Sequence, residues 1–92
     1  MSAEFPPEVR GTVLERCQAR CERCEKLTPL GAFHHRLPRK MGGTSRNIGT
    51  VENCLYVCVY CHHYIHSHPA EAYLKGWLLR DTEENVREVC AE

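Results

Sequence analysis

The sequence lacks any long hydrophobic run, since no apolar stretch approaches the roughly 20 residues that a membrane-spanning helix requires. Its first ten residues contain two prolines and no hydrophobic segment of the kind found in secretory signal peptides. It also lacks an excess of either charge, because 12 Lys and Arg residues balance 12 Asp and Glu residues. We therefore expect a cytoplasmic protein without a membrane anchor, whose overall field does not favour indiscriminate binding to nucleic acid.

Aromatic residues are few as well, at 8% of the 92 residues, whereas cysteine is abundant at seven residues. A domain of this length buries only about 60 to 65% of its unfolded surface, so its small core usually needs cross-links or a metal ion. An odd number of cysteines without a secretory signal disfavours a framework of disulfides. Metal binding is therefore the leading explanation for the cysteines.

Local patterns divide the chain into three parts. Residues 1–9 are an irregular lead-in, residues 10–80 form a small α+β domain, and residues 81–92 are an acidic tail that is either helical or loose. Thr12 and Glu15 form a capping-box pattern, which predicts the start of the first helix. Pro69 and Gly76 are typical of the first turn and the C-terminal end of another helix. The expected helices cover about 12–19, 62–68 and 69–75, and the expected strands cover 31–37, 55–57 and 77–80.

Four cysteines occur in two pairs, Cys21 with Cys24 and Cys58 with Cys61, and each pair is separated by two residues. This spacing lets both thiolates of a tight turn point at one ion, and two such pairs are typical of a tetrahedral structural zinc site closed to substrate. The zinc ion would join the N-terminal turn to the second strand and the helix after it, so its binding energy becomes folding energy. We expect a chelator to unfold the protein.

The other three cysteines, Cys17, Cys54 and Cys90, are left over by this pairing. Cys17 lies on the apolar face of the first predicted helix and is interpreted as a small buried hydrophobic residue. Cys54 lies close enough to the second pair in the sequence to be a rival zinc ligand.

Five of the six histidines lie near the cysteine pairs or the first strand, in a pattern that a structural zinc ion does not need: His34, His35, His62, His63 and His66. His62 and His66 are four residues apart and share one face of a helix, a spacing that lets two imidazoles bind one ion. The histidines therefore predict a second metal site. The alternative interpretation is a set of exposed histidines.

These histidines and cysteines are part of a longer pattern. In chain order it contains Phe33 to Arg36, then Gly42 with Gly43, then Glu52, Asn53 and Leu55, then Cys58 with Cys61, and finally His62 with His66. This pattern resembles the signature of HNH endonucleases, including the nine-residue spacing from Asn53 to His62 and the further four residues to His66. The resemblance covers roughly residues 10–79 and extends to small stand-alone HNH proteins of phages and prophages. It implies a small ββα-metal (His-Me finger) domain that is stapled by zinc and has short flanking helices.

The resemblance also implies a role for each residue of the pattern. His35 is implied to be the general base, His34 and His62 to be ligands of a catalytic ion, and His66 to be a third ligand or a phosphate contact. Asn53 is implied to brace the loop between the strands, and His35, Asn53 and His62 form the catalytic set. Because neighbouring strand residues point to opposite faces, His34 and His35 can serve one site only if the strand is distorted or ends early.

The activity that the resemblance implies is hydrolysis of phosphodiester bonds in double-stranded DNA, with one catalytic divalent cation besides the structural Zn²⁺. An imidazole-rich site accepts Ni²⁺, Co²⁺ or Zn²⁺ as well as Mg²⁺ or Mn²⁺. Residues 34–46 contain no acid, and their basic side chains are candidates for phosphate contacts: Arg36, Arg39, Lys40 and Arg46.

Two other functions stay open on the sequence. The protein is alternatively a catalytically inactive zinc module that binds DNA through the basic loop over 36–46, or an accessory subunit of a phage packaging machine. The inactive module needs the four paired cysteines and the basic loop but has no use for His35, which distinguishes it from the enzyme.

Overall fold

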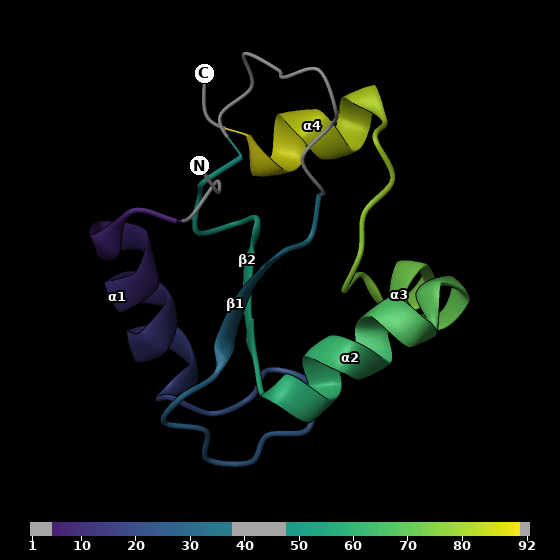
Figure 1. The fold of residues 1–92 in the computed structure, drawn as a ribbon. Coiled ribbons are helices and arrows are strands. Elements are labelled where there is room, and N and C mark those ends of the chain that lie inside the picture. Colours follow the sequence, from purple (N-terminus) through teal and green to yellow (C-terminus); the bar gives the residue numbers. More distant parts are fainter. Residues whose placement is uncertain (1–4, 38–47, 91–92) are drawn as a thin grey trace.

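The computed structural model describes residues 5–37 and 48–90 of the chain. Its elements are, in chain order, α1 (Pro7–Cys17), β1 (Ala32–His35), β2 (Cys54–Val57), α2 (Val59–Ser67), α3 (Pro69–Lys75) and α4 (Glu83–Val89). In Figure 1 the two strands run through the centre, with α1 on one side, α2 and α3 on the other, and α4 beyond their upper ends. The protein is therefore a small α+β domain, as its sequence predicts.

β1 and β2 form an antiparallel hairpin that is paired over all four residues of each strand. Tyr56 packs in one cluster with Val13 of α1, whereas its neighbour Val57 packs in another cluster with Ile65 of α2. Because successive side chains of a strand alternate between faces, the two faces of the hairpin are covered by different helices.

α1 begins at Pro7, earlier than the predicted start at residue 12. Proline is tolerated in the first helical turn because its missing N–H has no partner there. Thr12 lies inside the helix, where its Oγ1 donates to the carbonyl of Glu8 at 2.9 Å. The capping-box prediction is therefore wrong, and the helix ends at Cys17, followed by Gln18 in the left-handed conformation with φ 56°.

α3 and its C-terminal glycine agree with the prediction, since Gly76 ends the helix with φ 83°. The predicted strand over 77–80 is wrong, because in the described part of the chain the sheet contains only β1 and β2. Instead, the N–H groups of Trp77 and Leu78 donate to the carbonyl of Ala72, at 2.9 and 3.1 Å, and reverse the chain in a turn.

Three clusters of buried hydrophobic side chains hold these elements together. The first joins the cysteine turns to α2 and α3 through Cys21, Val57, Cys61, Ile65, Ala72 and Leu78. The second packs α1 against β2 through Phe5, Val13, Cys54 and Tyr56. The third contains Leu37, Ile48 and Val89. The segment after Asp81, predicted to be either helical or loose, is thus helical over α4 and contributes Val89 to the core.

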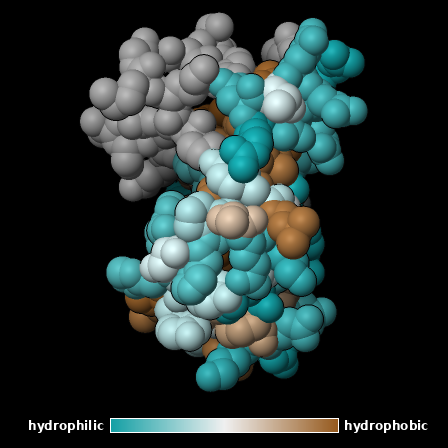
Figure 2. All heavy atoms as spheres, turned by 90° about the vertical axis from the view of Figure 1, so that its right-hand side faces the viewer, coloured by the Kyte–Doolittle hydropathy of each residue, from teal (hydrophilic) through white to brown (hydrophobic). Residues whose placement is uncertain are grey.

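The surface that Figure 2 colours by hydropathy is mostly hydrophilic, with hydrophobic side chains at separate places. The exposed large hydrophobic residues are Leu27, Leu30, Val59, Tyr60 and Leu74. Within residues 5–37 and 48–90, no helix combines the length and the apolar content needed to cross a bilayer.

Candidate metal centres

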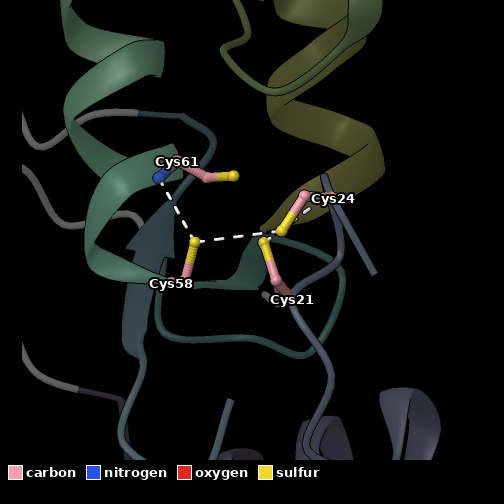
Figure 3. Close-up of side chains that lie close together, drawn as sticks. All are labelled: Cys21, Cys24, Cys58 and Cys61. Carbon is pink, nitrogen blue, oxygen red and sulfur yellow. Dashed lines mark hydrogen bonds between the residues drawn. The ribbon is translucent and has the colours of Figure 1, made fainter. Parts of the chain in front are cut away.

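The four paired cysteines lie together where the turn after α1 meets the start of α2, with their sulfur atoms facing one another (Figure 3). All four sulfur atoms lie within 4.8 Å of one another, and the Sγ atoms of Cys24 and Cys58 are 3.9 Å apart. Cys58 also caps α2, because its sulfur accepts the N–H of Cys61 at 3.4 Å, and the helix therefore begins before its predicted start. The arrangement can hold a zinc ion.

Backbone N–H groups around the cysteines favour the thiolate form that zinc binds. The sulfur of Cys21 accepts the N–H groups of Arg23 and Cys24, each at 3.4 Å. Burial raises the pKa of Cys21, but the backbone hydrogen bonds outweigh it and lower the pKa to about 6. Burial raises the pKa of Cys61, and a hydrogen bond from Arg23 acts in the opposite direction. The surroundings thus favour the thiolate form at Cys21, whereas burial outweighs Arg23 at Cys61 and raises its pKa to about 12.

Arg23 is a residue of this centre that the sequence analysis missed. Its Nη1 donates to the sulfur of Cys61 at 3.2 Å, and its guanidinium lies 3.7 Å from the ring centroid of Tyr64. A positive charge at this distance offsets the negative charge of the thiolates. The only sequence signal is its place between Cys21 and Cys24, which does not show where the side chain points.

Cys54 lies outside the four-cysteine group. It is 1% exposed in the cluster between α1 and β2, and burial raises the pKa of its thiol to about 12. The structure therefore places the suggested rival ligand away from the candidate zinc site. Cys17 is half-buried and packs against the same cluster, in agreement with its interpretation as a hydrophobic residue.

A second group consists of His34 from β1 with His62 and His66 from α2, and each offers a ring nitrogen within 4.8 Å of the other two. The Nε2 atoms of His62 and His66 are 3.3 Å apart, as expected for residues one helical turn apart. His34 is 4% exposed, His62 is half-buried and His66 is exposed. The three-histidine group can therefore hold a cation, and its His66 side is exposed to solvent.

The turn after α3 fixes the orientation of His34. The Nε2 of His34 lies 2.9 Å from the carbonyl oxygen of Trp77. Since a carbonyl oxygen only accepts, Nε2 carries the proton, and Nδ1 keeps the lone pair that a metal ion would bind. The sequence does not reveal this contact, because a main-chain carbonyl leaves no mark in the residue pattern.

The same surroundings keep His34 neutral. Burial lowers the pKa of His34 to about 4, opposed by the hydrogen bond to Trp77 and reinforced by His62 and His66. Burial and His66 also lower the pKa of His62. Neutral imidazole is the form that binds metal ions, so both side chains are in that form at physiological pH.

His35, predicted to be the general base, lies elsewhere. Its ring stacks on the ring of Phe5, with centroids 4.0 Å apart and planes 20° apart. Phe5 belongs to the cluster on the α1 side of the hairpin. The regular pairing of β1 extends through His35, so the strand is not distorted there, and the structure brings His34 rather than His35 together with His62 and His66.

Asn53 is fully buried just before β2. Its Oδ1 accepts the N–H of Leu37 at 2.7 Å, and its Nδ2 donates to the carbonyls of Ile48 and Leu37 at 2.9 and 3.3 Å. Leu37 and Ile48 are the described residues on either side of 38–47. One side chain thus joins the described segment that ends at Leu37 to the one that begins at Ile48.

Of the four basic residues predicted to contact phosphates, Arg39, Lys40 and Arg46 lie outside the described residues. Arg36 is described, and its guanidinium binds the main chain: Nε donates to the carbonyl of Gly76 at 2.8 Å and Nη1 to that of Glu52 at 2.9 Å. Arg36 therefore ties three segments of the protein together.

A comparison with protein families finds no family model that matches the chain. No curated protein is significantly similar to it either. The functional interpretation therefore depends on the four cysteines and the three histidines themselves.

Proposed function

We propose that this protein is a metal-dependent HNH endonuclease that hydrolyses phosphodiester bonds of double-stranded DNA by nicking or cutting it. The observation that carries the proposal is the convergence of His34, His62 and His66 from a strand and a helix on one partly open point. In this proposal β1, β2 and α2 form a ββα-metal unit. A structural zinc ion in the four-cysteine group holds the turn after α1 against α2.

Each residue of the proposed site has a separate task. The three histidines would hold a divalent cation (Mg²⁺, Mn²⁺, Ni²⁺, Co²⁺ or Zn²⁺), which when bound supplies positive charge to the phosphate and the leaving oxygen. Neutral imidazole can accept a proton at physiological pH. The resemblance assigns the proton of the attacking water to His35, whose ring stacks on Phe5 on the other face of the hairpin, so this assignment is tested separately below. The products are a 5′-phosphate and a 3′-hydroxyl.

The open side of the three-histidine group, where His66 is exposed, is where we place the DNA backbone. The basic residues Arg39, Lys40 and Arg46 lie in the sequence between β1 and β2 and provide the phosphate contacts in this proposal. Such contacts position the duplex without reading its sequence.

The proposal is tested by nicking of supercoiled plasmid with zinc-loaded protein and each of the five cations. His62→Ala removes a ligand, and His63→Ala is its control because it changes the next, exposed histidine of the same helix. We expect wild type and His63→Ala to nick, and His62→Ala to be slower by about 100-fold or more. Absence of nicking by wild type with every cation would favour the inactive zinc module, and equal rates for the two variants would exclude the three-histidine group as the site.

The role of His35 needs its own variant, because its ring lies on the other face of the hairpin from the three histidines. His35→Ala is compared with wild type at equal zinc content and with circular dichroism as a check on folding. If His35 is the general base, the nicking rate of His35→Ala should be lower than that of wild type by about 100-fold or more. A variant that stays folded and nicks as fast as wild type excludes this assignment but leaves the metal site standing.

A further inference from the structure

Arg36 directly follows the two histidines of β1, and its contacts reach two distant segments. Its guanidinium donates to the carbonyls of Gly76 and Glu52, at 2.8 and 2.9 Å. Its backbone carbonyl accepts the N–H of Leu79 at 2.8 Å, and its backbone N–H donates to the carbonyl of Asn53 at 2.9 Å. One residue thus fixes the turn after α3 both from its side chain and from its main chain.

That turn carries the main-chain group on which His34 depends. Gly76 takes a left-handed conformation with φ 83°, and the carbonyl of the next residue, Trp77, accepts the hydrogen bond from Nε2 of His34. Arg36 binds the carbonyl of Gly76, one peptide unit before the Trp77 carbonyl. A shift of this turn would therefore remove the partner that sets the orientation and the tautomer of His34.

We propose that Arg36 is a positioning residue for the three-histidine group, rather than a phosphate contact. Through the carbonyl of Gly76 it holds the turn whose Trp77 carbonyl keeps the proton of His34 on Nε2 and leaves Nδ1 available to a metal ion. The inference rests on the proposed function only in taking the three histidines as a cation site.

An arginine suits this task better than a lysine. The guanidinium presents several N–H donors in a rigid plane, so Nε and Nη1 bind two carbonyls at once, those of Gly76 and Glu52. An ammonium group at the end of a flexible stem keeps the positive charge but does not reproduce this fork. Arg36→Lys therefore separates the positioning role from the charge that a phosphate contact needs.

The test measures binding of Ni²⁺ to zinc-loaded protein by calorimetry for wild type, Arg36→Lys and the control Arg80→Lys. Arg80 is exposed beyond the same turn, with its guanidinium 4.0 Å from the ring centroid of Tyr73. We expect affinity to fall by about 10- to 100-fold in Arg36→Lys and to be unchanged in Arg80→Lys. Equal affinities in all three proteins would overturn the positioning role.

The tautomer of His34 gives a second readout, because it would not change in Arg36→Lys if Arg36 only stabilised the fold. Nitrogen NMR of the imidazoles in wild type, with zinc but without Ni²⁺, should show His34 protonated on Nε2, and Arg36→Lys should show a mixture of tautomers. A wild-type His34 protonated on Nδ1 overturns the inference even if the variant does not fold. Wild type that binds no Ni²⁺ contradicts the proposed function instead, and the tautomer measurement then still decides the role of Arg36.

Discussion

His34 and His35 are neighbours in β1, but their rings lie on opposite faces of the hairpin. The His34 ring lies 5.5 Å from the His62 ring between centroids, on the α2 face, whereas the His35 ring stacks on Phe5 on the α1 face. The alternation of side chains along a paired strand requires this separation. The two histidines therefore have different partners, and their substitution should have different effects.

We predict that His34→Ala weakens Ni²⁺ binding to zinc-loaded protein by about 10-fold or more, whereas His35→Ala leaves it unchanged. The reason is that only His34 offers a nitrogen within 4.8 Å of those of His62 and His66. Calorimetric titration of both variants checks this. A stronger effect of His35→Ala than of His34→Ala would contradict the placement of the two rings.

Removal of zinc should unfold the protein, because the four cysteines that can hold it come from the turn after α1 and from the start of α2. We predict that Cys21→Ala abolishes zinc binding and cooperative folding. Cys54→Ala is the matched control, since Cys54 is equally buried at 1% exposure but lies outside the group, and it should keep the zinc ion. Zinc content and thermal unfolding with and without a chelator measure both effects. A chelator that leaves the unfolding transition of wild type unchanged would contradict the structural role.

Asn53→Ala should destabilise the protein by about 2 to 4 kcal/mol, because it leaves buried main-chain groups of Leu37 and Ile48 without their partner. Asn85→Ala is the control: the Asn85 side chain donates one exposed hydrogen bond, to Arg80, and its loss should cost less than about 1 kcal/mol. Denaturant unfolding gives both values. Similar costs at the two positions would show that Asn53 does not hold Leu37 and Ile48 together.

Two glycines should respond in opposite directions to alanine. A Cβ on Gly31 would lie 2.7 Å from the carbonyl oxygen of Val57 and 2.8 Å from the Tyr56 ring, so Gly31→Ala should destabilise by about 1 to 3 kcal/mol. A Cβ on Gly11 meets nothing within 4 Å, and Gly11→Ala within α1 should stabilise by about 0.5 to 1 kcal/mol. Thermal unfolding of the two variants distinguishes the signs, and a neutral Gly31→Ala would refute the close packing there.

The features that the sequence predicts correctly are those set by residues close together in the chain. Each cysteine pair spans a single turn, and Pro69 and Gly76 mark the two ends of one short helix. The start of α1 was missed because the pattern of Thr12 and Glu15 suits a helix interior as well as an N-terminus.

The features that the sequence does not reveal depend on contacts between distant segments. The carbonyl of Trp77 meets His34 across 43 positions, and the guanidinium of Arg36 meets Gly76 across 40. Main-chain acceptors carry no residue signature. The hydrogen bonds to the carbonyl of Ala72 that make a turn after α3 were therefore not visible in the sequence, and a strand was predicted over 77–80 instead. Likewise, a basic residue next to other basic residues suggests phosphate binding, although the guanidinium of Arg36 binds main-chain carbonyls.

The central claim is that one chain holds two cations on separate ligand sets, one of sulfur and one of nitrogen. Elemental analysis of protein loaded with Zn²⁺ and then equilibrated with Ni²⁺ tests it most directly. We predict about two ions per chain for wild type and for His63→Ala, and about one, the zinc ion, for His62→Ala. Two ions retained by His62→Ala, or a single ion in wild type, would contradict the account.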